Sequence, residues 1–166
     1  MFFKRSKPDP ESAVALGHYQ AIVARARKPD WYVAGQVPDT VDGRFDMVAL
    51  MLSLYTFRLE AIDTPAARRM IARVDEHFVE DMDASLRQIG IGDMVIGKHV
   101  GKTMSALGGR LGAYREAGLE DDDAMKTALQ RNLYRGVETP PLDWALARVR
   151  EEQSRLAALA DAELLA

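Results

Sequence analysis

The stretch 37–59 constrains the fold most, because a polar, turn-forming decapeptide runs directly into the most apolar segment of the chain. From Phe45 onward, apolar side chains fall on nearly every side of a helix, and a helix that is apolar all round is buried. Asp46 and Arg58 interrupt this segment, which falls short of the roughly 20 mainly apolar residues that cross a bilayer. We therefore predict a buried central helix over about residues 45–59.

Around this helix the sequence predicts an all-α fold, a single compact domain of about six helices. Apolar residues recur at helical spacing, and proline, glycine or capping residues mark the ends of each pattern. The other helices are expected to begin near Glu11, Thr64, Asp93, Asp121 and Thr139. A chain of 166 residues can bury a self-sufficient core. We assign residues 11–166 to one helical domain and residues 1–10 to a flexible leader.

Local signals refine these boundaries. The segment 28–42 contains several prolines and a glycine, so it is predicted to be a loop with buried aromatic anchors. Thr40 or Asp42 is expected to cap the central helix, and Asp93 the helix after Gly90. The core stripe of the preceding long helix is expected to continue as far as Ile89.

Composition excludes several functions. The chain has no cysteine and therefore no disulfide or thiolate chemistry, and its formal charge of −3 argues against DNA as a partner. His77, Glu80 and Asp81 have the spacing of helical metal ligands, but no other helix supplies a matching set. A solvated acidic face with one histidine explains them better. We predict no enzymatic activity, no cofactor and no metal.

The first eight residues combine two aromatic and three basic side chains, without an apolar segment of signal-peptide length. The protein is therefore expected in the cytoplasm. Phe2 and Phe3 beside Lys4 and Arg5 offer a contact to an anionic membrane surface, but such a contact alone binds marginally. A frayed terminus is the alternative. Any membrane contact is predicted to be peripheral, at the inner membrane surface.

A stripe of small residues runs along the helix after Gly90, formed by Gly97, Gly101, Ser105 and Gly109. Each glycine inside a helix costs about 0.5–1 kcal/mol relative to alanine. A tight crossing against the central helix is the preferred explanation, and a groove for a bound helix or ligand is the other. Lys98 and Lys102, with His99 and Arg110 nearby, are predicted to form a positive edge beside the stripe.

Polar residues gather at two junctions, one before the central helix and one after the long helix that follows it. Capping and ion pairing explain this gathering, and so does a recognition site. Five sequence motifs cover these junctions and the helices that follow them. They are VPDTVDGRFD (37–46), Asp81-Met82-Asp83, LRQIGIGDMVIGK (86–98), Gly109-Arg110 with Tyr114, and RNLY (131–134).

In the order and spacing of these motifs the sequence resembles the ubiquinol-cytochrome c chaperone family. Two positions differ: Gln88 stands where the family usually has an acid, and Met51-Leu52 lacks the family's histidine. The resemblance implies an all-helical, non-enzymatic assembly factor that binds newly made cytochrome b during assembly of the ubiquinol-cytochrome c reductase. It also implies two further partners, the ribosome and a second assembly factor.

The client-binding residues that we predict share a position at the two junctions or along the small-residue stripe. They are Asp39, Thr40, Asp42, Gly43, Arg44, Asp81, Asp83, Arg87, Asp93, Gly97, Lys98, Gly101 and Lys102. In this hypothesis they form the small-residue floor and charged rim of a groove for a client helix. Two alternatives stay open at this point. One is a generic helical interaction module that docks on the ribosome or a membrane, and the other is a carrier of an apolar ligand.

Overall fold

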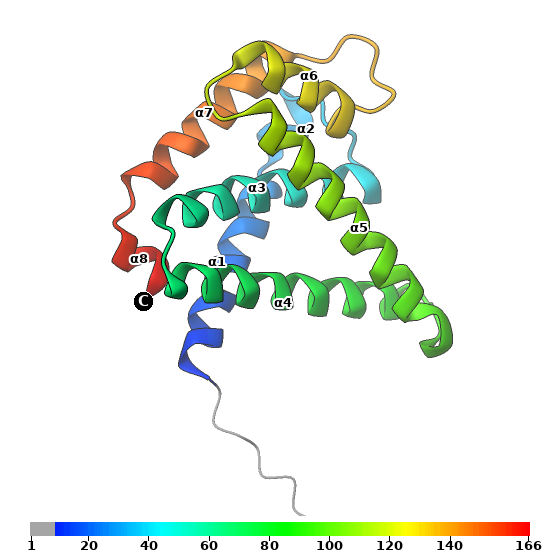
Figure 1. Cartoon of the computed structure of the whole chain (residues 1–166). Helices are drawn as coiled ribbons and strands as arrows, with labels where there is room; N and C mark the ends of the chain where they lie inside the picture. Colours follow the sequence, from blue (N-terminus) through cyan, green and yellow to red (C-terminus); the bar gives the residue numbers. More distant parts are fainter. Residues whose placement is uncertain (1–8) are drawn as a thin grey trace, which may run out of the picture.

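The computed structural model describes residues 9–166, and Figure 1 shows how their helices are arranged. Residues 1–8 of the predicted leader (1–10), and the membrane contact predicted through Phe2 and Phe3, lie outside the described residues. Asp9 caps α1, which begins at Pro10.

Within residues 9–166 all regular structure is helical, which confirms the predicted all-α class. The helices are α1 (Pro10–Ala26), α2 (Pro29–Val33), α3 (Val41–Ile62), α4 (Pro65–Gln88), α5 (Asp93–Ala117), α6 (Asp122–Asn132), α7 (Leu142–Ala158) and α8 (Asp161–Leu165). The six longer helices correspond to the six that the sequence predicted. The two short ones, α2 and α8, have five residues each and were not predicted.

Helix α3 is the centre of the fold, as predicted. Every residue from Asp46 to Phe57 is buried, so this helix has no solvent face along three turns. Helices α1, α4, α5 and α7 all pack against it. In Figure 1, α4 and α5 form the two arms of a V whose apex is the turn between them, and α7 with α8 lies at the opposite side of the molecule.

Side-chain caps fix where several helices begin. Thr40 Oγ1 accepts a hydrogen bond from the amide of Gly43 at 3.1 Å, so Thr40 rather than Asp42 caps α3. Thr64 Oγ1 caps α4 in the same way at 3.2 Å. Helix α4 ends before Gly90, whose φ of 87° lies in the left-handed region that glycine reaches without strain. These signals were read correctly from the sequence.

Three local predictions were wrong. The expected loop contains α2, because Pro29 suits a first helical turn and Trp31 is buried edge-on against Trp144, with ring centroids 5.4 Å apart. Gly92, not Asp93, occupies the cap position of α5. Ile89 is 72% exposed and does not continue the core stripe, because the chain turns away from α3 there.

Candidate functional site

The polar residues at the start of α3 are held by local contacts. Arg44 Nε donates to Asp39 Oδ1 at 2.7 Å, and both side chains are exposed. Asp42 lies exposed in the first turn of α3. Gly43 is buried against the chain before the helix, where an added Cβ would overlap the carbonyl oxygen of Pro38. This group therefore needs glycine for close packing and presents one surface ion pair to solvent.

The polar residues between α4 and α5 are joined by one arginine. Arg87 Nε donates to Asp83 Oδ2 at 2.8 Å, and its Nη1 pairs with Asp93 across the turn. Arg87 thus ties the end of α4 to the start of α5. Asp81 does not belong to this group, because it accepts a 2.6 Å hydrogen bond from the hydroxyl of Tyr19 and so fastens α4 to α1.

The two groups do not form one continuous rim. Among residues 9–166, no hydrogen bond or ion pair joins the group at the start of α3 to the group between α4 and α5. The start of α3 lies beside Arg110, through Asp46. Gly101 precedes Arg110 by nine residues, which is about 13 Å along a helix. The structure thus separates the predicted site residues into two regions connected by α5.

One face of α5 is open along most of its length. Five small residues fall within about 80° of one another around an ideal helix, and we call them the glycine face. They are Gly97, Gly101, Ser105, Gly108 and Gly112. A Cβ added at any of these four glycines would meet nothing within 4 Å among the described residues. Lys98 and Lys102 lie along one side of this face and are exposed.

The open face corrects two predictions. The small residues do not pack against the central helix, because the core face of α5 lies on the other side, with Ile96, Leu107 and Tyr114 buried. Arg110 is not part of a free positive edge either. Its side chain is only 11% exposed, since it pairs with Asp46.

Asp46 is the centre of a buried ionic network that the sequence did not predict. It is 3% exposed, and its two carboxylate oxygens contact two arginines. Arg110 from α5 donates to Oδ1 at 2.6 Å, and Arg135, which follows α6, donates to Oδ2 at 3.0 Å. The guanidinium of Arg110 also lies 5.0 Å from the centre of the Phe45 ring. Two distant parts of the chain are therefore fixed to the start of α3.

Two tyrosines surround this network. Tyr114 on α5 is fully buried, and burial together with the charge of Asp46 raises the pKa of its phenol. Its hydroxyl has no hydrogen-bond partner among the described residues. Tyr134 donates to the carbonyl oxygen of Gly35 at 2.6 Å, and burial raises its pKa to about 12. Both phenols are therefore neutral at physiological pH.

The motifs that carried the family resemblance meet at this network. Phe45 and Asp46 end the first motif, Arg110 and Tyr114 form another, and Arg135 follows directly after the RNLY motif. The signal for Asp46 was thus present in the sequence, in a carboxylate inside an otherwise apolar helix that requires a partner when buried. Which arginines would reach it depends on contacts 64 and 89 residues away in sequence.

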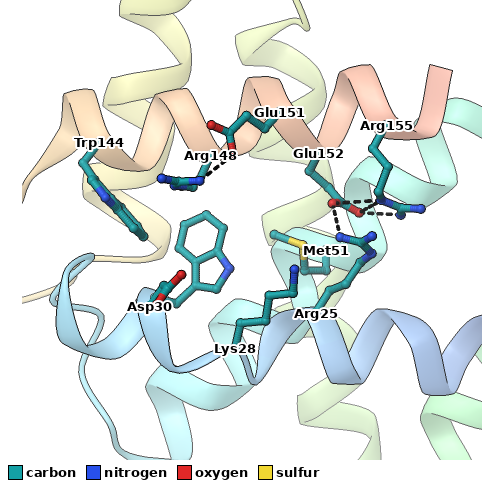
Figure 2. A pocket seen from close by; sticks show the side chains of 10 residues that line it. Arg25, Lys28, Asp30, Met51, Trp144, Arg148, Glu151, Glu152 and Arg155 are labelled. Carbon is teal, nitrogen blue, oxygen red and sulfur yellow. Dashed lines mark hydrogen bonds and ion pairs between the residues drawn. The ribbon is translucent and has the colours of Figure 1, made fainter. Parts of the chain in front are cut away.

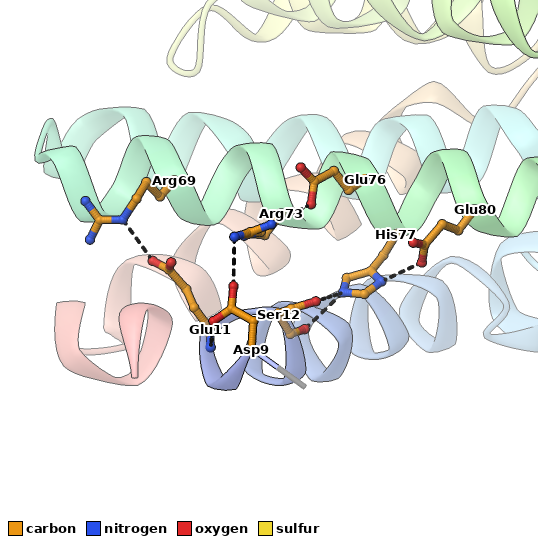
Figure 3. Close-up of polar contacts among 8 residues, drawn as sticks. All are labelled: Asp9, Glu11, Ser12, Arg69, Arg73, Glu76, His77 and Glu80. Carbon is orange, nitrogen blue, oxygen red and sulfur yellow. Dashed lines mark hydrogen bonds and ion pairs between the residues drawn. The ribbon is translucent and has the colours of Figure 1, made fainter. Parts of the chain in front are cut away.

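A polar seam joins α1 to α4, and Figure 3 shows its side chains. Arg73 Nη2 donates to Asp9 at 2.7 Å, and Arg69 Nε donates to Glu11 at 3.1 Å. His77 Nε2 donates to the carbonyl oxygen of Ser12 at 2.9 Å, while Nδ1 lies 3.1 Å from Glu80. His77 therefore acts as part of helix packing, and Asp81 points to Tyr19 rather than to His77.

A charged pocket lies between α1, α2 and α7, with a volume of about 240 Å³ (Figure 2). Glu152 accepts hydrogen bonds from both Arg25 and Arg155, and Arg148 lies over the ring of Trp144 at 5.3 Å. A second pocket of about 320 Å³ lies between α1 and α4 and is lined by His77, Glu80 and Asp81 among others. Charged walls of this kind do not favour an apolar ligand.

Asp75 on α4 is a carboxylate that loses hydration without gaining a charged or hydrogen-bonding partner among residues 9–166. It is half-buried, and burial raises its pKa to about 6. No hydrogen bond or ion pair within residues 9–166 compensates for this loss of hydration. In the folded protein this carboxyl therefore titrates near pH 6, about two units above its ordinary pKa of 3.8.

The structure is thus that of an all-α protein built around one buried helix, with a buried ionic network and an open glycine face. The family model described as ubiquinol-cytochrome C chaperone matches residues 34–166. A solved structure, the crystal structure of the Cbp3 homolog from Brucella abortus, is 33% identical to the chain and superposes on it with a TM-score of 0.81. The match covers 93% of this chain and 86% of that one. No curated protein matches this sequence.

The chain belongs to the ubiquinol-cytochrome c chaperone family, as its motifs predicted. Family membership supports a chaperone role in the assembly of the ubiquinol-cytochrome c reductase, and such a role is non-enzymatic. Among residues 9–166, no helix is both long and apolar enough to cross a membrane.

The buried ionic network predicts that substitutions of its members lower the free energy of unfolding by very different amounts. Asp46→Ala leaves the buried guanidinium of Arg110 unpaired, and we expect a loss of about 3–5 kcal/mol in the free energy of unfolding. Arg135→Ala removes a half-exposed partner and should cost about 1 kcal/mol or less. Asp42→Ala, in the exposed first turn of the same helix, is the control. Denaturant unfolding measures all three, and equal losses for Asp46→Ala and Asp42→Ala would contradict the network.

Asp75 predicts a pH-dependent stability. In the folded protein its pKa is about 6, and its ordinary value is 3.8, so the folded state binds the proton more tightly. Stability should fall as pH rises from about 4 to 6 and stay low above that. Asp75→Asn should raise the melting temperature at neutral pH by about 2–4 °C, a modest gain because solvent partly screens a half-exposed group.

The gain from Asp75→Asn should vanish near pH 4, where the wild-type carboxyl is protonated in the folded state. Thermal melts across this pH range test the prediction. Glu120→Gln removes an exposed carboxylate and serves as the control, with no expected pH-dependent gain. A gain that is the same at pH 4 and at neutral pH would contradict the assignment.

The glycines of α3 and α5 predict opposite responses to alanine. Gly43→Ala places a methyl group against the carbonyl oxygen of Pro38 and should destabilise the protein by about 1–3 kcal/mol. Gly101→Ala meets open space inside a helix and should stabilise it by about 0.5–1 kcal/mol. Denaturation midpoints of both variants measure the difference. A destabilising Gly101→Ala would mean that the glycine face is covered within the chain.

Proposed function

We propose that this protein binds newly synthesised or unassembled cytochrome b and holds it for assembly of the ubiquinol-cytochrome c reductase. Membership of the ubiquinol-cytochrome c chaperone family supports this choice of complex. The glycine face of α5 supplies the single observation that supports a client-binding surface in this chain. It is a largely exposed face of small residues on a helix whose other side packs into the core.

The glycines of α5 destabilise the helix that carries them. Each glycine in a helix interior costs about 0.5–1 kcal/mol relative to alanine, and a contact inside the chain usually explains it. Here the missing Cβ atoms of Gly97, Gly101, Gly108 and Gly112 would touch nothing. These glycines lower the stability of the helix, and no contact within the described residues explains them. We therefore expect the bare backbone of this face to contact another molecule.

The chemistry of the client fits such a surface. Cytochrome b is a membrane protein of transmembrane helices, and helices of that kind pack closely against small residues. The glycine face runs from Gly97 to Gly112, about 22 Å at 1.5 Å per residue, enough for four turns of a client helix. Lys98 and Lys102 lie along its side, near the end that Gly97 begins. The surface is an open helix face, so we propose close packing along α5 in place of a closed groove.

The predicted residues at the start of α3 lie beside Arg110, on the opposite side of α5 from the glycine face. They are Asp39, Thr40, Asp42, Gly43 and Arg44. We therefore propose them as a second, separate contact region. The exposed Asp39–Arg44 pair is its polar part. We place the protein in the cytoplasm, peripheral at the inner membrane surface when it carries its client. A ribosome contact and a second assembly factor stay predictions of the family resemblance.

Deletion of the gene in its own host tests the role. We expect a selective loss of spectrally detected b-type cytochrome and of reductase activity, both restored by the wild-type chain. Unchanged levels of both would contradict the proposed function.

A matched pair of glycine variants tests the surface. Gly101→Leu fills the middle of the glycine face without an internal clash, and we expect copurification of cytochrome b to fall about tenfold or more. Gly17→Leu adds the same side chain to an exposed glycine of α1 that also has open space around it, and it should bind normally. If both variants retain cytochrome b equally, the client lies elsewhere on the protein.

A further inference from the structure

The turn between α4 and α5 carries large apolar side chains that the rest of the chain leaves uncovered. Ile89 is 72% exposed, Met94 is fully exposed and Val95 is 46% exposed, and we call these three residues the turn tip. The turn forms the apex of the V made by α4 and α5, and it points away from α7 and α8 (Figure 1). Exposed apolar side chains that cluster at one projecting point mark a contact site.

The shape of the turn tip limits which kind of partner can bind to it. A helix or peptide that binds through apolar side chains usually enters a concave groove. The turn tip is a projecting end, and the two pockets described above lie elsewhere, between α1 and the helices α2, α4 and α7. A projecting apolar point is better suited to a phase that yields around it, such as the boundary between lipid headgroups and acyl chains.

The charges behind the turn tip complement an anionic surface. Lys98 and Lys102 follow Met94 by one and two helical turns on the same side of α5. Neither lysine has an ion-pair partner among residues 9–166, whereas Arg87 is occupied by Asp83 and Asp93. Residues 94–105 hold two lysines and no acidic side chain, in a chain whose formal charge is −3. The positive charge is therefore local to this end.

The lengths of these side chains fit the same arrangement. One helical turn is about 5.4 Å, so Lys98 and Lys102 stand about 6 and 12 Å along the axis from Met94. Lysine stems can lie along apolar surface while the ammonium group stays at a polar boundary. With Met94 among the upper acyl chains, both ammonium groups can reach the level of lipid phosphates.

We propose that the turn tip inserts into an anionic phospholipid surface, with Ile89, Met94 and Val95 in the headgroup–acyl boundary and Lys98 and Lys102 on lipid phosphates. Neither part suffices alone, since reversible peripheral binding requires an apolar and an electrostatic contribution together. This inference goes beyond client binding and does not depend on it. Lipid vesicles contain no client, so the two proposals can fail separately.

Vesicle flotation with the purified full-length chain tests the proposal. We expect binding to mixed phosphatidylcholine–phosphatidylglycerol vesicles and much weaker binding to phosphatidylcholine alone. Ile89→Ser with Met94→Ser should weaken binding at least about tenfold, because burial of one large apolar side chain is worth that factor or more. Lys98→Glu with Lys102→Glu should weaken it about 30-fold or more, since each lysine near an anionic surface contributes about fivefold.

Two control variants separate the turn tip from general effects. Val33→Ser with Leu119→Ser removes exposed apolar side chains in other parts of the chain and should bind like wild type. Lys28→Glu with Arg68→Glu changes the net charge by the same amount at other exposed positions and should weaken binding much less. Circular dichroism shows whether each variant keeps its helices.

The proposal is overturned if the wild-type chain binds mixed and neutral vesicles equally weakly. It is also overturned if the turn-tip variants bind mixed vesicles as well as wild type, which would assign the contact to another part of the chain. Turn-tip variants that bind vesicles normally and lose cytochrome b would make this turn a protein contact instead.

Discussion

The rest of the structure depends on how the carboxylate of Asp46 is neutralised inside the core. Helix α3 is buried on all sides from Asp46 to Phe57, so the carboxylate of Asp46 cannot remain hydrated. A buried charge requires a partner, and Arg110 and Arg135 supply it from two distant parts of the chain. Because Arg110 lies on α5, this pairing also sets the rotation of α5 against α3. The orientation of the glycine face follows from it.

Helix α5 therefore has two sides with different tasks. Ile96, Leu107 and Tyr114 bury one side in the core, and the paired Arg110 fixes it. These contacts hold the helix in place, so the opposite side can tolerate glycines that contribute no packing. An amphipathic helix normally covers its outer side with charged residues. Here the outer side is largely bare backbone, which is the physical reason to propose an external partner.

Local chemistry in the sequence predicted most of the fold. The all-round apolar pattern identified α3, and Thr40, Thr64 and Gly90 marked helix ends because caps and left-handed turns depend on adjacent residues. Features set by distant contacts were missed. Helix α2 forms because Trp31 meets Trp144, and the sequence could not show that the small residues of α5 face outward. The role of the predicted site residues stays a prediction, and their division into two regions required the structure.

The glycine face and Met94 of the turn tip lie on one side of α5, since Met94 falls within the same angular range as Gly101 and Gly112. From Met94 to Gly112 this side is about 27 Å long, close to the roughly 30 Å of a bilayer's hydrocarbon core. A client helix packed along it, with the turn tip at the lipid boundary, would have one end at the membrane surface. Its apolar side chains would then be shielded by α5 until the lipid replaces that contact. Such an arrangement explains why an uncovered helix face and an uncovered apolar turn occur next to each other.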